Sequence, residues 1–474
     1  MGEREALKVD TLVVNGITIT MDTNRTIYDP GFIAITKGKI VATGSASSCP
    51  YEAAETIDAS GMVILPGLIN GHTHLDQAAR RGCFDDDPTS TRNERLSVSL
   101  GLTESRARRA AALGLLEQLH YGITTVQENH WVHYHIHSTD GICDAIQDSG
   151  MRAVVSRGIN DVEEYTPAAF CEDAGEVLKD LDRLEEKYDS DYIQITSEPC
   201  TILRCKPETI LAMVDWAKQR NKTWIIHMAH DQKELADALE TVGMGCVQYA
   251  EQLGVLSPDM LGIHCAALLD EEVDLLGKHG IRISHCPECV IKGGGQVPPI
   301  WELEKLGATV AIGTDGTSSN TGQNLWASMK NAVYMQRVRF ADGYLGSAEQ
   351  ALEMVTIKGA EVLLMEDRIG SIEAGKEADI ALFKTDQLHL APGAMLVSNL
   401  VYSGCNIRAD TVLIGGNVVL RAGKSTTLDE ERILAQARET QAELVGEAGL
   451  KEVIGLARSW PVVASSQADP ASAC

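Results

Sequence analysis

The chain has 474 residues, of which 44% are hydrophobic and 23% are charged, and its formal net charge is −26. This is the composition of an ordinary globular protein, long enough for one large and one smaller domain. The negative charge excludes nucleic acid and an anionic membrane surface as main partners, because both attract positively charged proteins, but it permits a small neutral or cationic organic substrate.

The sequence also bears on where the protein works. Residues 1–8 contain no apolar core of a signal peptide. No stretch reaches the roughly 18 apolar residues that a membrane span requires. The 12 cysteines are scattered along a long chain, which favours reduced thiols over a disulfide framework. We therefore expect a cytoplasmic protein that does not enter the membrane.

Short strands and turns are predicted for residues 10–66. Apolar, β-branched runs occur at 11–14, 17–20, 32–35 and 40–42. Asn15-Gly16 is a strong signal for a two-residue hairpin turn, and a second turn is expected at 37–39. These strands predict a small antiparallel sheet that is not a complete domain by itself.

After residue 66 the pattern changes to strands that alternate with helices. Helices are predicted at 103–119, with Thr103 as N-cap, and at 174–187. Eight alternating units within residues 67–370 predict an α/β fold of the (β/α)8 TIM-barrel type. The strands are the one that carries His72 and those at 123–126, 153–156, 192–196, 223–227, 261–264, 281–285 and 309–313.

The last part of the chain returns to strands. Residues 378–383 and 411–420 have the same texture of strands and turns as the N-terminus. We therefore expect residues 1–66 and 371–430 to fold together into one composite β-sandwich. Residues 431–474 are predicted to form a C-terminal helix and a flexible tail, because the final residues from 461 onward are small and polar.

Residues that suit a metal ion gather at the ends of the predicted barrel strands. Side chains alternate along a strand, so His72 and His74 face the same side and can converge on one ion; the alternative is two solvent-facing histidines at a strand end. Imidazole nitrogens are favoured ligands of zinc and its first-row neighbours. TIM barrels carry their chemistry at these strand ends. The later strands end in His227, His264, His285 and Asp315.

These motifs resemble the amidohydrolase superfamily. Within it, the chain is similar to the group of atrazine chlorohydrolase, triazine hydrolase, the phenylurea and molinate hydrolases, and the cytosine and guanine deaminase-like enzymes. The resemblance covers about residues 10–425. The motifs that carry it are Pro66–His74, Gly122–Val126, His227, His264-Cys265, His285-Cys286-Pro287 and Gly313–Gly316.

The resemblance implies one divalent metal ion per subunit, held by His72, His74, His227 and Asp315 with a water molecule. A bound cation lowers the pKa of its water toward neutrality. Asp315 and His264 are implied to be catalytic: Asp315 takes the proton of the water, and His264 steadies the hydroxide or polarises the group under attack. Three histidines and a carboxylate fit Zn²⁺, Fe²⁺, Co²⁺ or Mn²⁺, and zinc is favoured. The superfamily resemblance also implies a homo-oligomer.

One departure from the family pattern affects the predicted substrate. Ring-deaminating members have a glutamate three positions after the strand-five histidine, whereas this chain has His230. This favours direct hydrolysis of a C–N, C–S or C–halogen bond in a small, xenobiotic-like urea, amide, carbamate, thiocarbamate or triazine. The alternative is an aminohydrolase (deaminase) of a purine, pyrimidine, pterin or s-triazine ring. A third hypothesis is a catalytically inactive scaffold.

Other residues at strand ends are candidates for substrate contact. Asn129 and His130 end the second strand, and His285 ends the seventh; together with His230 they are predicted to line the substrate site. Glu198, at the end of strand four, bridges a second metal ion, replaces the missing glutamate or caps a turn. The histidines at 133, 135 and 137 form a second metal site, a loop that faces the substrate or a merely exposed loop.

Cys286 and Cys289 form a lone Cys-x-x-Cys that overlaps the His285 motif. Structural zinc sites of this kind use two such pairs, and a second pair is missing from the sequence. The motif alone is therefore weak evidence for zinc.

Overall fold

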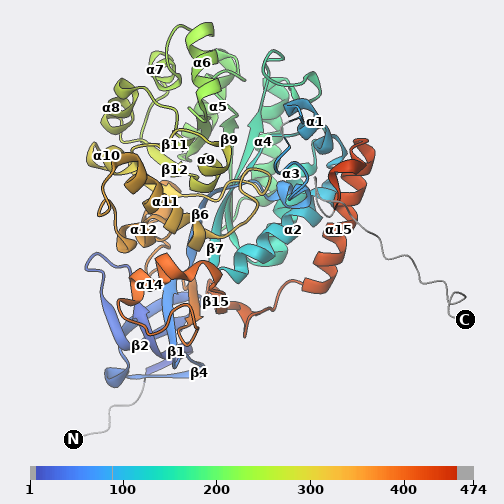
Figure 1. Ribbon diagram of the computed structural model, residues 1–474. Coiled ribbons are helices and arrows are strands. Elements are labelled where there is room, and N and C mark those ends of the chain that lie inside the picture. Colours follow the sequence, from blue (N-terminus) through green and yellow to red (C-terminus); the bar gives the residue numbers. More distant parts are fainter. Residues whose placement is uncertain (1–6, 88, 456–474) are drawn as a thin grey trace, which may run out of the picture.

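The computed structural model describes residues 7–87 and 89–455. A barrel of parallel strands with helices around it stands beside a sheet that contains strands from both chain ends (Figure 1). The predicted combination of a TIM-type barrel with a smaller β unit is therefore confirmed. In the described part of the chain, no helix has the length and apolar character needed to cross a bilayer.

All eight predicted barrel strands are present, in two parallel four-stranded sheets that follow chain order. The two sheets meet at both seams. At one seam the His227 amide donates to the Cys200 carbonyl at 3.1 Å, and at the other the Asp315 amide donates to the His72 carbonyl at 3.0 Å. The strands are β6 (Leu68–Thr73), β7 (Ile123–His130), β8 (Arg152–Ile159), β9 (Ile193–Pro199), β10 (Trp224–Met228), β11 (Met260–His264), β12 (Arg282–His285) and β13 (Thr309–Ile312).

The interior of the barrel is packed with apolar side chains. Ile69, Val154, Ile225 and Ala311 come from four different strands and form one buried cluster with residues from 360–369. The strands are buried along nearly their whole length, as expected when helices cover the outer face of a parallel sheet. This packing leaves the carboxyl ends of the strands as the place where polar side chains collect.

Two helices were predicted with nearly the correct limits. Helix α2 (Glu104–His120) is capped by Thr103, whose side chain accepts from the Arg106 amide, and α4 (Ala174–Tyr188) is capped by Asp173. The other helices between residues 75 and 406 are η2 (Leu75–Arg80), α1 (Arg92–Ser97), η3 (Val98–Gly101), α3 (Ser138–Ser149), η4 (Ala168–Phe170), α5 (Pro207–Lys218), α6 (Gln232–Thr241), α7 (Cys246–Gln252), α8 (Asp270–Lys278), α9 (Pro287–Gly293), α10 (Ile300–Lys305), α11 (Leu325–Phe340), α12 (Ala348–Met354), α13 (Ile357–Val362), α14 (Leu396–Ser403) and η5 (Gly404–Asn406).

Strands from both chain ends form one nine-stranded sheet, in which β5 pairs antiparallel with β14. Val13, Ile40 and Leu413 come from well-separated strands of this sheet but share one core, so the sheet wraps around it. The predicted sandwich is thus a single curled sheet, and the domain limits at 66, 370 and 430 stay a prediction. Its strands are β1 (Leu7–Ile19), β2 (Ile27–Thr36), β3 (Lys39–Ser45), β4 (Tyr51–Asp58), β5 (Met62–Pro66), β14 (Ile380–Lys384), β15 (Ala409–Ile414), β16 (Asn417–Arg421) and β17 (Lys424–Ser425), with η1 (Ala46–Ser48) after β3.

The predicted hairpin turn at Asn15-Gly16 is wrong. Strand β1 continues through both residues, and its register against β2 shifts there, as in a β-bulge. Asn15 has φ of 70°, which asparagine tolerates better than most residues and which a bulge accommodates as readily as a turn. At Gly16, a Cβ atom would lie 2.7 Å from Ile64 Cδ1, so close packing requires this glycine.

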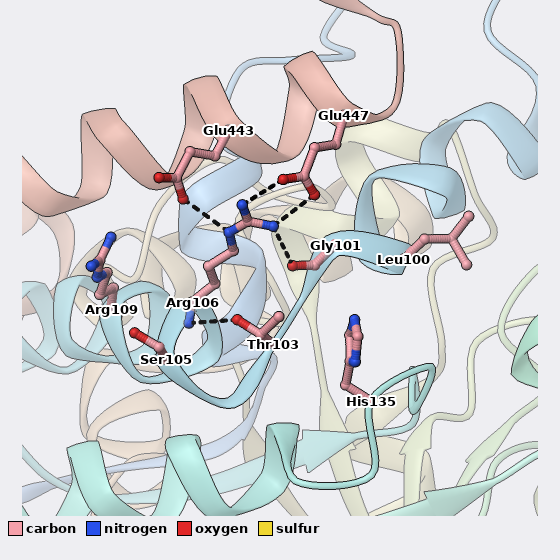
Figure 2. A pocket seen from close by; sticks show the side chains of 9 residues that line it. All are labelled: Leu100, Gly101, Thr103, Ser105, Arg106, Arg109, His135, Glu443 and Glu447. Carbon is pink, nitrogen blue, oxygen red and sulfur yellow. Dashed lines mark hydrogen bonds and ion pairs between the residues drawn. The ribbon is translucent and has the colours of Figure 1, made fainter.

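Helix α15 (Glu430–Glu447) confirms the predicted C-terminal helix, and η6 (Lys451–Val453) follows it; the predicted flexible tail lies outside the described residues. In Figure 2, Arg106 of α2 reaches Glu443 and Glu447 of α15. Its Nε donates to Glu443 at 2.9 Å, and its Nη2 donates to Glu447 at 2.6 Å. These residues border a cavity of about 430 Å³, which none of the predicted metal ligands or catalytic residues lines.

Candidate active site

The four predicted metal ligands come together at the carboxyl end of the barrel. The ring of His72 lies 4.8 Å from that of His74 and 5.1 Å from that of His227, centroid to centroid. Asp315 Oδ1 lies 3.7 Å from His72 Nε2 and 3.5 Å from His74 Nε2. All four residues are at most 8% exposed. Residues 243 positions apart therefore surround a space of the size of one ion.

Each of the three imidazole rings is oriented through its Nδ1 atom, which lies close to an acceptor from a neighbouring strand. An acceptor at Nδ1 fixes the tautomer with its lone pair on Nε2, the arrangement that metal-binding histidines commonly show. The contacts are His72 to Gln127 Oε1 at 2.9 Å, His74 to the Asn129 carbonyl at 2.6 Å, and His227 to Glu198 Oε1 at 3.1 Å and to the Cys200 carbonyl at 3.3 Å.

The electrostatics of these residues fit a cation. Burial, aided by the neighbouring His74, lowers the pKa of His72 to about 3, and burial with its histidine neighbours holds the pKa of His227 well below its usual range. Burial alone would raise the pKa of Asp315, but the adjacent His74 and His72 lower it. His72 Nε2 is buried and has no hydrogen-bond partner among the described residues. The neutral imidazoles of His72 and His227, an ionised carboxylate and an unpartnered nitrogen suit a metal ion such as zinc.

The backbone is strained where the second sheet ends. Ala229, His264, Cys265 and Asp315 have φ between 46° and 72°, a left-handed region that residues with a Cβ atom rarely occupy. All four follow or end β10, β11 or β13, beside the candidate metal site. Strained backbone of this kind clusters at functional sites, where the surrounding structure holds side chains in required directions.

His264, which the sequence predicts to be catalytic, lies beside the four predicted metal ligands. Its ring centroid is 5.8 Å from that of His72 and 5.5 Å from that of His227. It is 2% exposed, and its Nδ1 has no hydrogen-bond partner within the described residues. Burial and the neighbouring His230 hold the pKa of His264 well below its usual range, so its ring is neutral at pH 7 and has a nitrogen able to accept a hydrogen bond.

His230 stands at the entrance to this group. Its ring centroid is 4.3 Å from that of His264, and its side chain is 42% exposed. Nδ1 lies 3.1 Å from Asp231 Oδ2, so Nε2 is turned away from this carboxylate and lies 3.6 Å from Cys289 Sγ. His230 is thus the solvent-facing member of the histidine cluster, consistent with its predicted position near a substrate.

Glu198 has a position that the sequence did not predict. It is fully buried behind His227, where Oε1 meets His227 Nδ1 and Oε2 accepts from Ser156 at 3.0 Å. Burial raises the pKa of Glu198 to about 8. The geometry places Glu198 as the residue that orients His227, which differs from a turn cap and from a proton shuttle on the substrate side. A carboxylate that ends the strand beside a metal-binding histidine could have indicated this role.

The remaining substrate candidates are buried. Asn129 uses its carbonyl to hold His74, and His130 places Nε2 2.8 Å from Ser138 Oγ. His285 is 0% exposed, and neither ring nitrogen has a hydrogen-bond partner in the described structure. Substrate contact by these three residues stays a prediction.

The histidines at 133, 135 and 137 point to different partners. His133 Nε2 lies 2.9 Å from Thr139 Oγ1, while His137 Nδ1 lies 3.2 Å from Asp140 Oδ2. His135 lines the cavity drawn in Figure 2. The alternating pattern therefore does not bring these three rings together, because the segment is not an extended strand.

Comparison with known proteins gives consistent matches. A model of the amidohydrolase family matches residues 63–419. A 5-methylthioadenosine/S-adenosylhomocysteine deaminase of Desulforudis audaxviator is 32% identical over 419 residues, covering 88% of this chain and 95% of the relative. A 5'-deoxyadenosine deaminase of Methanobrevibacter smithii is 32% identical over 397 residues, covering 82% of this chain and 88% of the relative.

Solved structures match as well. A variant of atrazine chlorohydrolase from Arthrobacter aurescens TC1, complexed with zinc and atraton, superposes with a TM-score of 0.84. It is 26% identical, and the match covers 91% of this chain and all of the other.

Proposed function

The chain belongs to the amidohydrolase family, and from this premise we propose that it is a metal-dependent aminohydrolase that removes the exocyclic amino group of an adenine nucleoside. One observation carries this proposal: relatives that span most of the chain are named as deaminases of 5'-substituted adenosines. They support the alternative reading of the sequence over hydrolysis of a urea, carbamate or triazine. They give no support to a role in xenobiotic degradation.

His72, His74, His227 and Asp315 would hold the ion, with zinc favoured. When bound, such an ion lowers the pKa of water toward neutrality. The chain's own residues then handle protons. Asp315 Oδ1, which faces the imidazoles, accepts the proton of the attacking water. The neutral ring of His264 orients that water by a hydrogen bond.

His230 supplies the proton that the ring nitrogen of the base gains as water adds to the adjacent carbon, and Asp315 passes the proton of the water to the leaving amine. Burial alone would lower the pKa of His230, but the hydrogen bond and the charge of Asp231 raise it overall. Asp231 also holds the His230 imidazole by its Nδ1, which leaves Nε2 to donate to a ring nitrogen of the adenine substrate. A histidine paired with a carboxylate thus takes the place of the glutamate found in ring-deaminating relatives, since an imidazolium is a proton donor near neutral pH.

The proposal is tested on two panels of compounds, with ammonia release measured for the first panel and loss of substrate, followed by chromatography, measured for both. The first panel contains adenosine, 5'-deoxyadenosine, 5'-methylthioadenosine and S-adenosylhomocysteine; the second contains ureas, carbamates and chlorinated or alkylthio triazines. We expect turnover in the first panel. Turnover restricted to the second panel would overturn the proposal, and no turnover in either would favour an inactive scaffold.

Substitutions at residue 230 test the proton transfer. His230→Ala removes the donor and should lower kcat for adenine nucleosides by about 10²-fold or more. His230→Glu restores the family residue and should raise activity on ring substrates above that of the wild type. Equal rates for His230→Ala and the wild type would exclude the proposed role, and no gain in His230→Glu would count against a shuttle at this position.

A second candidate function is hydrolysis of a carbonyl or triazine carbon that needs no protonated ring nitrogen. The observation that favours it is the absence of a carboxylate at position 230. The same two panels separate this candidate from the first.

A further inference from the structure

We infer that His230, His264 and Cys289 form a second zinc site at the entrance to the barrel, distinct from the four-residue site below it. One ligand atom from each of the three residues lies within 4.8 Å of the other two. The residues follow β10, end β11 and lie in α9, respectively, so consecutive barrel units bring them together. Two imidazole nitrogens and one cysteine sulfur are a zinc-type ligand set that leaves a fourth position open.

His230 is already oriented for such an ion. Its Nδ1 is held by Asp231 Oδ2 at 3.1 Å, and its Nε2 faces Cys289 Sγ at 3.6 Å. Asp231 is fixed in turn, because its Oδ1 accepts from the Glu234 amide at 2.8 Å as the N-cap of α6. A carboxylate on the far nitrogen of a histidine is the usual support of a metal-binding ring.

His264 provides an independent observation. It is 2% exposed, and its buried Nδ1 lacks a hydrogen-bond partner in the described part of the chain. Buried polar atoms are almost always hydrogen-bonded, so an unpartnered ring nitrogen in a cluster of possible ligands points to a missing partner. The same ring also lies near His72 and His227.

Access differs between the two sites. In the second site the His230 side chain is 42% exposed and Cys289 is half-buried, although His264 is only 2% exposed, whereas all four residues of the first site are at most 8% exposed. A zinc ion can therefore reach the second site from solvent while the first is filled. On binding, the S–H bond of Cys289 breaks, a Zn–S bond forms and the proton passes to the buffer. The ion would occupy His230 and His264, so it should inhibit turnover; this consequence rests on the proposed function.

Cobalt distinguishes the two sites by spectroscopy, without any substrate. The four ligands proposed for the first site include no sulfur atom, whereas the second site contains Cys289, whose thiol also contacts the Asp315 side chain. We expect the first equivalent of Co²⁺ added to the metal-free full-length protein to give only ligand-field bands. The second equivalent should add a near-ultraviolet charge-transfer band from thiolate to cobalt. No such band with two bound equivalents, or its appearance with the first, would overturn the inference.

Substitutions test whether the thiolate-to-cobalt band comes from Cys289. Cys289→Ser should abolish it, whereas Cys49→Ser, which changes a half-buried thiol in the terminal sheet, should retain it. Asp231→Asn should weaken the second site about 10- to 100-fold and leave the first unchanged. If Cys289→Ser fails to fold, protection of the wild-type Cys289 thiol from alkylation by excess zinc, read by peptide mass spectrometry, replaces it. A band that persists in Cys289→Ser, or a thiol that zinc does not protect, would refute the site.

Inhibition is measured separately. Excess zinc should inhibit the wild type and Cys49→Ser, and Cys289→Ser should require at least tenfold more zinc for the same inhibition. A cobalt band without zinc inhibition would support the second metal site but contradict the proposal that this site shares His230 and His264 with the catalytic machinery.

Discussion

The two halves of the barrel contribute to the candidate site in different ways. The first sheet, β6–β9, provides His72 and His74 together with the acceptors that orient the three imidazole rings. The second sheet, β10–β13, provides His227, the water-orienting His264 and Asp315, and the turn after β10 carries His230; Asp315 and His230 are the residues proposed to move protons. Among described residues at barrel strand ends, left-handed backbone at residues other than glycine occurs only in the second half.

This difference separates two tasks. Relaxed strand ends with several hydrogen-bond acceptors hold ligand rings in fixed directions, which sets metal affinity. Strained turns aim side chains at the space where a substrate must enter, which sets reactivity. Changes to the supporting acceptors of the first half should therefore affect metal binding alone, whereas changes to the proton-transfer groups of the second half should lower the rate even in the metal-loaded enzyme.

The largest expected effect is that of Asp315→Asn in the second half. The amide keeps the shape of the side chain but cannot accept the proton of water, so kcat should fall by about 10³-fold. Activity is measured at saturating metal, with metal content determined on the same sample. Asp86→Asn is the matched control, because Asp86 is exposed and has a similar left-handed backbone. Wild-type kcat in a fully loaded Asp315→Asn variant would break the division of tasks.

Glu198→Gln in the first half should have a different signature. It removes the carboxylate that orients His227, so metal affinity should fall about 10- to 100-fold. At saturating metal, kcat should return close to that of the wild type, because no proton-transfer group has changed. Affinity is measured by competition with a chelator, and the exposed Glu164→Gln is the control. If the metal affinity is unchanged but kcat is low, Glu198 takes part in the reaction itself and does not only orient His227.

The sequence predicted the metal-ligand residues better than the residues that support them. His72, His74, His227 and Asp315 could be found because each ends a strand, and parallel strands of a barrel end at one face. The support from Gln127 and Glu198 depends on which strands become neighbours when the barrel closes, and that is not a local property of the sequence.

Two further features show the same limit in the terminal sheet. The hairpin at Asn15-Gly16 was predicted from a dipeptide that serves turns and bulges equally. The tertiary contact with Ile64 decided between them. Strand β4 (Tyr51–Asp58) was missed because its pairing with β1 is parallel and nonlocal, and most of its residues remain partly or fully exposed.

A smaller effect concerns the pH dependence of stability in the metal-free protein. Burial lowers the pKa of His285 to about 3, whereas an unfolded chain protonates it near 6.5. The unfolded state therefore binds more protons, and stability decreases as the pH falls from 6.5 toward 3. His285→Asn should reduce this slope by up to about 1.4 kcal/mol per pH unit, measured by urea unfolding between pH 6 and 4. Near pH 8 the stability of the wild type and that of His285→Asn should depend on pH with the same slope. If the two slopes are also equal between pH 6 and 4, the folded protein does not hold the His285 ring neutral.

The smallest effect tests the strain directly. Ala229 has φ of 48°, a conformation that costs a residue with a Cβ atom about 1–2 kcal/mol and a glycine much less. Ala229→Gly should therefore raise the free energy of unfolding by up to about 1 kcal/mol, despite the larger entropy of glycine in the unfolded chain. The matched control, Ala145→Gly in the interior of α3, should lower it by about 1 kcal/mol, because that residue is helical and buried. If both variants lose stability equally, the left-handed turn after β10 stores no strain, and the contrast between the two halves would rest on hydrogen bonding alone.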